Sequence, residues 1–225
     1  MKTLLTTLFL FATSCCFSQD CAKYYLLQNN KTIEMSIFNK KGKVTGKQVY
    51  TVSNVNTSGG ATTATIQSEM FDDNNKSIAT ATNSIQCKGG VMMMNMKMML
   101  PQRQQEQPVT NAEVKAESIY IDYPANMAVG DELKEGNFSM DMEVNGMKQQ
   151  LNMVVNNRKV EAKETITTTA GTWDCYKINY KSKMTMKTLG IGIPISMTGT
   201  EWFAPSFGIV KTVSNYGGTE ITAIK

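Results

Sequence analysis

The chain has no histidine among its 225 residues. This absence removes the commonest general base, a major zinc and copper ligand, and the side chain that titrates near physiological pH. Neither a Ser-His-Asp nor a Cys-His catalytic unit can be built without it. We therefore expect a protein that is not an enzyme and that carries no cofactor.

Charge of either sign is also scarce, and only the N-terminus has a long apolar run. The chain has 23 basic and 19 acidic residues, for a formal net charge of +4. The lysines are dispersed and are not interleaved with aromatic residues, so we expect no nucleic-acid partner. No later segment is apolar enough to cross a bilayer, so we expect no transmembrane segment.

The N-terminal segment, MKTLLTTLFLFATSCCFSQDCAK, has the features of a secretory signal. Lys2 precedes an uncharged apolar run over residues 4–17, and Cys16 and Ser18 are small residues at the third and first positions before a cleavage site. This predicts a signal peptide over residues 1–18 and a single secreted or periplasmic domain over residues 19–225. The segment ATSC is a weaker match to a lipoprotein signal, and it leaves open a lipid tether through Cys15.

Three cysteines remain after such cleavage, and none forms a C-x-x-C pair. Outside the cytoplasm they allow at most one internal disulfide. If the first strands form a simple meander, the first strand begins and the fourth strand ends at the same rim. Cys21 precedes the first strand and Cys87 closes the fourth, so both lie at that rim. We therefore predict a Cys21–Cys87 disulfide, with Cys175 left as a packed free thiol.

Alternation with a period of two dominates the rest of the chain, and Gly, Asn and Asp separate the alternating runs. The clearest example is SMDMEV followed by MKQQLNMVV, two strands joined by Asn145-Gly146, which is typical of a type I′ hairpin turn. These patterns predict an all-β, mainly antiparallel fold: a curved sheet or partly open β-barrel of about ten to twelve strands. The polar segment over residues 101–118 lacks an alternating face, and we predict a short helical or irregular insertion there.

The segment VMMMNMKMML contains six methionines in ten residues. In a strand, Met92, Met94, Met96 and Met98 would share one face, while Asn95 and Lys97 would mark the opposite face as exposed to water. We expect the methionine face to point inward, either as core packing or as the lining of a concave face that holds an apolar ligand. The candidate lining residues are Met92, Met94, Met96, Met98, Met140 and Met142.

Two further interpretations of these residues remain open. Thioethers bind Cu(I), so the protein could be a methionine-rich copper chaperone. Same-face neighbours on one strand lie about 6.6 Å apart, too far to share one ion, so Met140 and Met142 would have to complete the ligand set. The least favoured alternative is a hydrolase that uses Asp141 and Glu143, which more simply belong to a solvated strand face.

Two late segments also have structural interpretations. Lysines recur on one face of the strand that follows Trp173, and we interpret that face as solvated. The segment EWFAPSFGIVK predicts an aromatic lid over one end of the sheet, with Pro205 forcing a loop.

Five segments together resemble a known family. They are CAKYY, VMMMNMKMMLP, YPANMAVGDELKEG, NRKVEAKETITTTAGTWDCYKINY and EWFAPSFGIVKT. The chain resembles the TapB-like family of secreted proteins, which carry a domain of unknown function, over nearly the whole mature chain. AGTWDCYKI and EWFAPSFGIVK are its most specific parts. Leu27 departs from the pattern, in which a proline is expected after the tyrosine pair.

The resemblance implies a curved, partly open β-barrel of the envelope lipoprotein-carrier type, with no accepted catalytic residues. Fold-level similarity carries little information about function. With the absence of histidine, it favours a non-catalytic binding or structural module of the envelope. Its partner would be an apolar ligand or an envelope protein.

Overall fold

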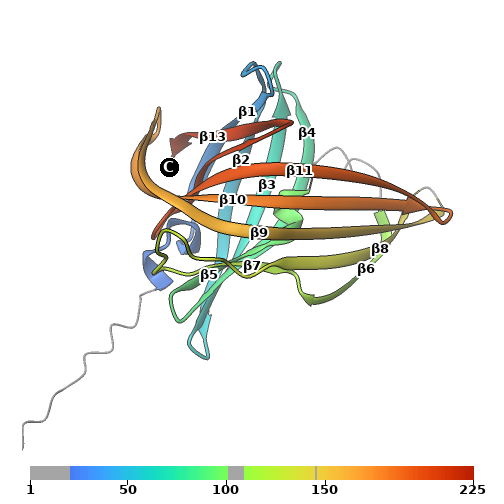
Figure 1. Cartoon of the computed structure of the whole chain (residues 1–225), viewed down its shortest axis with the longest axis horizontal. Coiled ribbons are helices and arrows are strands. Elements are labelled where there is room, and N and C mark those ends of the chain that lie inside the picture. Colours follow the sequence, from blue (N-terminus) through green and yellow to red (C-terminus); the bar gives the residue numbers. More distant parts are fainter. Residues whose placement is uncertain (1–20, 101–108, 145) are drawn as a thin grey trace, which may run out of the picture.

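Thirteen strands form one antiparallel sheet in the computed structural model, which describes residues 21–100, 109–144 and 146–225 (Figure 1). The predicted signal peptide and Cys15 lie outside the described residues. The first seven strands are β1 (Thr32–Asn39), β2 (Val44–Ser58), β3 (Ala61–Asp72), β4 (Ser77–Lys88), β5 (Val91–Asn95), β6 (Val109–Ser118) and β7 (Tyr120–Tyr123). The other six are β8 (Gly136–Val144), β9 (Met147–Thr168), β10 (Gly171–Thr188), β11 (Ile191–Ala204), β12 (Gly208–Ser214) and β13 (Gly217–Ile224). Three short 3-10 helices complete the described elements: η1 (Cys21–Lys23), η2 (Tyr25–Leu27) and η3 (Met96–Met99).

The order of the strands makes this sheet a nearly closed barrel. The order is β6-β8-β9-β10-β11-β12-β13-β1-β2-β3-β4-β5-β7, so β6 and β7 occupy opposite edges. These two strands are nevertheless consecutive in the chain, separated only by Ile119. The two edges must therefore meet at that residue, and the carbonyl of Ile119 accepts a hydrogen bond from the backbone nitrogen of Met96 at 2.8 Å. The predicted all-β antiparallel fold is confirmed.

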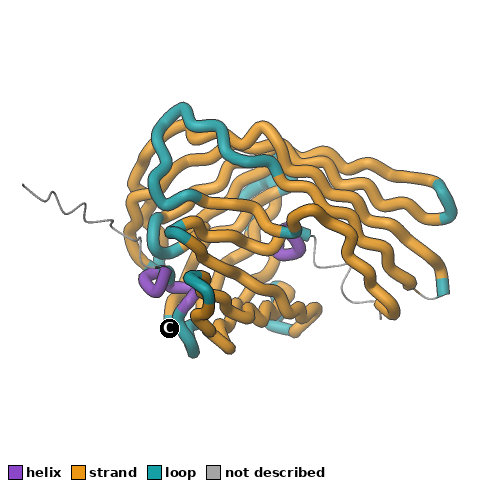
Figure 2. Tube along the Cα trace, turned by 90° about the horizontal axis from the view of Figure 1, so that it is seen from below, coloured by secondary structure: helices purple, strands orange, loops and turns teal. Residues whose placement is uncertain are grey.

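Strands β8 to β11 extend together to one side of the molecule (Figure 1), and the view from below shows strands that reach out to the same side (Figure 2). Val144 pairs with Met147, as the predicted hairpin of β8 and β9 requires, whereas Asn145 of the predicted type I′ turn lies outside the described residues. The hairpin of β10 and β11 ends in exposed apolar side chains, with Ile191 73% and Ile193 68% exposed. The alternating pattern therefore continues beyond the part of the sheet that is buried.

The segment predicted as a helical or irregular insertion is partly a strand, and this part of the prediction is wrong. Residues 101–108 lie outside the described residues, whereas Val109–Ser118 forms β6 and pairs with β8. The pairing shifts register between Thr110 and Glu113 and again between Lys115 and Ser118. Because such irregularities break the two-residue alternation, the sequence offered no continuous apolar face by which to recognise the strand.

The methionine-rich strand ends earlier than its sequence predicts. Asn95 is only 5% exposed instead of facing water, and its side-chain oxygen accepts a hydrogen bond from the backbone nitrogen of Lys97 at 3.0 Å. Asparagine competes with strand pairing through such local bonds, so the chain turns into η3 at Met96. Met92 and Met96 are nevertheless completely buried, as expected for core residues.

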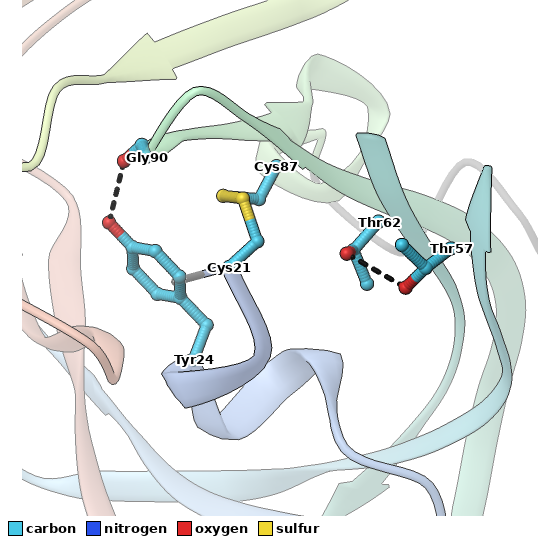
Figure 3. Close-up of a disulfide and its surroundings, with 6 residues drawn as sticks. All are labelled: Cys21, Tyr24, Thr57, Thr62, Cys87 and Gly90. Atoms are coloured by element: carbon cyan, nitrogen blue, oxygen red, sulfur yellow. Dashed lines mark hydrogen bonds between the residues drawn. A yellow bond between two sulfur atoms is a disulfide. The ribbon is translucent and has the colours of Figure 1, made fainter. Parts of the chain in front are cut away.

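A disulfide joins the N-terminal segment to the end of β4 and confirms the predicted pairing (Figure 3). Cys21 and Cys87 have Cα atoms 5.6 Å apart, and Cys175 is a buried free thiol. The hydroxyl of Tyr24 donates to the carbonyl of Gly90 at 3.2 Å beside this bridge. The two contacts hold η1 and η2 against the β4–β5 turn.

Candidate functional site: a methionine-lined cavity

A cavity of about 360 Å³ lies among the strands near η3. Most of its lining is apolar, and elements from both ends of the sequence contribute to it. Six methionines belong to the lining: Met35, Met70, Met94, Met98, Met99 and Met197. Other apolar lining residues are Leu26, Ile33, Ile37, Phe38, Leu100 and Ile209. Such a wall is adaptable, because methionine is unbranched and its thioether is polarizable.

The six predicted lining residues separate into three groups. Met94 and Met98 line the cavity. Met92 and Met96 are packed in the core, where the sulfur of Met96 would lie 2.7 Å from a Cβ placed on Gly136. The structure does not place Met140 or Met142, both on β8, among the described lining residues.

Four of the lining methionines were not candidates from the sequence: Met35, Met70, Met99 and Met197. Met35 lies between Glu34 and Ser36, which predicts an inward orientation, whereas Met70 is followed by Phe71; neither pattern predicts a common site. Met35 and Met70 meet because β2 lies between their strands, where both pair with Gln48. The lining thus depends on the register of several strands.

Gln48, on β2, is a polar residue that lies between Met35 on β1 and Met70 on β3. Its side chain lines the cavity, and the residue is 6% exposed. Its side-chain nitrogen, Nε2, has no hydrogen-bond partner within the described part of the chain. A buried amide donor flanked by two thioethers is unusual, because most buried polar groups are paired. Tyr50, two residues later, also lines the cavity, and burial raises the pKa of its hydroxyl well above the ordinary value.

The cavity also contains one end of a buried ion pair. Glu201 on β11 lines it, and Oε1 of Glu201 lies 3.5 Å from Nη2 of Arg158 on β9. The hydroxyl of Tyr123 donates to Oε2 of Glu201 at 3.1 Å. Nη1 of Arg158 donates to the carbonyls of Asp122 at 2.9 Å and Lys134 at 3.0 Å.

Burial and pairing shift the pKa of the Glu201 carboxyl group in opposite directions. Desolvation raises the pKa of Glu201, whereas the Arg158 charge and the hydrogen bonds from Tyr123 and Arg158 lower it, leaving a net rise. Arg158 also lies over the ring of Tyr123, at 4.7 Å from its centroid. The alternating patterns of the sequence did not predict this network. The signal available was that Glu201 shares an alternating face with Phe203, which is completely buried.

The predicted aromatic lid forms, but away from the cavity. Phe207 stacks on Tyr25 with ring centroids 5.2 Å apart and contacts Trp173 at 5.3 Å. The backbone nitrogen of Tyr25 donates to the carbonyl of Ser206 at 3.0 Å. The lid therefore fastens η2 to the β11–β12 turn, and none of these aromatic rings is part of the described cavity lining.

The remaining charged candidates also lie outside the described lining. Asp141 accepts a hydrogen bond from Gln150 at 3.0 Å, and neither Asp141 nor Glu143 lines the cavity. Lys181 and Lys183 are exposed, as expected for a solvated face. In the described ranges, no three His, Cys, Asp or Glu side chains gather in a way that could hold a metal ion. None of the helices described is both long and apolar enough to span a membrane.

Comparison with protein families gives a match over most of the chain. Residues 28–219 match the model of the DUF3108-like family. The chain belongs to the DUF3108-like family. The TapB-like name suggested by the sequence stays an expectation. Comparison with curated proteins gives no match.

Two solved structures share the fold of this DUF3108-like chain. One, from Bacteroides fragilis NCTC 9343, is provisionally described as an exported protein with a YmcC-like fold. It has a TM-score of 0.69 and 21% identity, and the alignment covers 88% of this chain and 96% of that one. The other, from Parabacteroides distasonis ATCC 8503, is provisionally described as a lipoprotein. It has a TM-score of 0.72 and 20% identity, covering 92% of this chain and all of that one.

Proposed function

We propose that the protein is an exported, non-catalytic binding module that holds an apolar ligand in the methionine-lined cavity. The observation that carries the proposal is a cavity of about 360 Å³ lined by six methionines. That volume lies within the range of small-molecule sites, which are mostly apolar with a few polar groups. Methionine walls also suit ligands of varied shape.

Three features support export. The N-terminal sequence has the pattern of a signal peptide, with Cys15 offering the alternative of a lipid tether. A disulfide between Cys21 and Cys87 is typical of proteins that fold outside the cytoplasm. The two proteins that share the fold are described as exported and as a lipoprotein.

Uptake of an apolar naphthylamine dye, which fluoresces when it leaves water, tests ligand binding directly. The wild-type protein should bind the dye, and Met94→Lys should weaken binding at least tenfold because a lysine charge would enter an apolar wall. Met147→Lys is the matched control, since Met147 is 44% exposed on β9 and is not a cavity residue. Thermal melts of both variants separate loss of binding from loss of folding.

Two results would contradict the proposal. One is a wild-type protein that takes up no dye and yields no apolar compound when protein from its native envelope is extracted and analysed by mass spectrometry. The other is equal loss of dye binding in the two folded lysine variants. Either result would favour a scaffold that contacts an envelope protein instead.

Cu(I) is a second candidate, because six thioethers surround the same cavity. A Cu(I) titration distinguishes it from apolar binding. If copper is the cargo, Met94→Leu combined with Met98→Leu should abolish tight Cu(I) binding, while dye binding should persist because leucine keeps the wall apolar. Absence of tight, stoichiometric Cu(I) binding by the wild-type protein would reject this candidate.

A further inference from the structure

The unpartnered amide of Gln48 gives chemical information about what the cavity holds. Gln48 lies between Met35 and Met70 across three adjacent strands, so the side chains beside it on the same face are thioethers. Its residue exposure of 6% leaves little access to bulk water, and Nε2 has no partner in the described structure. A hydrogen-bond donor held in this way is satisfied when the cavity's occupant brings an acceptor.

The charge of the lining restricts which acceptor is suitable. Among the described residues that line the cavity, Glu201 is the only one with a charged side chain. Its partner Arg158 is not among these lining residues, and its terminal nitrogens face Glu201 and the backbone carbonyls of Asp122 and Lys134, which leaves only Nε without a described partner. An anionic head group in the cavity would therefore meet a buried carboxyl group, with no cation in the described lining to offset it.

We infer that the cavity takes an apolar molecule that carries a neutral hydrogen-bond acceptor, such as the carbonyl of an ester, amide or ketone, and that Gln48 Nε2 donates to this acceptor. The inference rests on the proposed apolar binding function and narrows its ligand class. The hydrocarbon part lies against methionines such as Met94 and Met197, and the carbonyl oxygen lies against Gln48. Free fatty acids and other anionic lipids are the disfavoured class.

Displacement of the bound dye by two probes of equal heavy-atom count tests the inference. The probes are methyl dodecanoate, which has an ester carbonyl, and pentadecane, which has no polar atom. We expect Gln48→Leu to weaken binding of methyl dodecanoate about tenfold, the size of one hydrogen bond in an apolar site, and to leave pentadecane binding unchanged or tighter. Comparing each probe between wild type and variant cancels the different solubilities of the two probes in water.

Further variants and a third probe complete the design. Gln67→Leu is the control, because Gln67 is exposed on the neighbouring strand β3 and both probes should bind it as they bind the wild type. Gln48→Met provides a second apolar replacement that matches its neighbours if the leucine variant folds poorly. Dodecanoate at pH 8 should bind the wild type more weakly than methyl dodecanoate does.

The outcomes separate this inference from the function on which it rests. If both probes displace the dye and the Gln48 variants affect them equally, the inference is wrong while apolar binding stands. Tighter binding of dodecanoate than of the ester would also overturn it. If neither the dye nor any probe binds the wild type, the proposed function and the inference both fail.

Discussion

Replacement of Arg158 by methionine should destabilise the fold in a way that depends on pH. The Arg158 side chain is completely buried, and it makes the only described ion pair with Glu201, whose side chain is 2% exposed. Removing one partner of a buried pair leaves an uncompensated charge and costs about 3–5 kcal/mol. We therefore expect Arg158→Met to lower the free energy of unfolding by about 3–5 kcal/mol near pH 7.5.

The loss of stability caused by Arg158→Met should become smaller at acidic pH. Burial already raises the pKa of Glu201 in the wild type, and loss of the Arg158 charge, which lowers that pKa, raises it further. A carboxyl group with a raised pKa in the folded state keeps its proton to higher pH than it does in the unfolded chain. Its stabilising contribution is then fully present below the unfolded pKa and is lost as the pH rises through the folded pKa. Below about pH 4.5, the remaining cost of about 1–3 kcal/mol comes mainly from the two unpaired carbonyls of Asp122 and Lys134, beside the lost contact with the ring of Tyr123.

Urea unfolding followed by circular dichroism between pH 4 and pH 8 measures both effects. Adding Glu201→Gln to Arg158→Met should remove the pH dependence that Glu201 gives to the stability of the single variant. The double variant should also be about 2 kcal/mol more stable than Arg158→Met at pH 7.5, because the buried charge is gone. Lys134→Met is the control, since the Lys134 side chain is 66% exposed and its ion pair with Asp122 spans 3.7 Å. A loss that is constant across this pH range, or a double variant no more stable than Arg158→Met, would refute the argument.

Three further predictions concern covalent and steric features. Replacing Cys21 and Cys87 together by serine should lower the free energy of unfolding by about 4 kcal/mol, because the disulfide closes a loop between residues 66 positions apart and so reduces the entropy of the unfolded chain. Urea melts of the wild type with added reductant should show the same loss. The Cys175 thiol has its pKa raised to about 12 by burial and by nearby carboxylates, so at pH 8 it should react with a thiol reagent only on unfolding; rapid reaction of the folded protein would contradict its burial. Gly46→Ala should cost more than 2 kcal/mol in a thermal or urea melt, because its Cβ would lie 2.2 Å from the carbonyl oxygen of Phe71; a cost below 0.5 kcal/mol would show that β3 shifts freely.

Local patterns predicted most of the strands, with β6 as an exception, because most strands carry their own alternation. The β8–β9 hairpin follows from Asn145-Gly146 and two alternating runs. The Cys21–Cys87 disulfide follows from the meander that those runs imply. In both cases the physical cause lies within a short stretch of chain or in a simple sequence of turns.

Features that depend on how strands far apart in the sequence pair with one another could not be predicted in the same way. Met35 and Met70 come to one cavity because β1 and β3 pair with the same residue of β2, and Met197 reaches it from β11. The closure of the sheet at Ile119 requires knowing that β6 pairs with β8 while β7 pairs with β5. The methionine strand ends where the side-chain oxygen of Asn95 accepts a hydrogen bond from the backbone nitrogen of Lys97, a local contact that the alternation of the neighbouring residues did not predict.

The unequal lengths of the strands imply that different parts of the fold open at different rates. Strands β9, β10 and β11 contain 22, 18 and 14 residues, whereas β1 contains 8. Near Ile178 and Phe203 the β10–β11 ladder is buried in the interior, but at its far end the side chain of Leu189 is 82% exposed and that of Ile191 is 73% exposed. Backbone amides at the far end should therefore exchange with deuterated solvent through local fraying, while those at the base should exchange only when the whole domain unfolds. The β10–β11 hairpin would thus be rigid at its buried base and flexible at its exposed end.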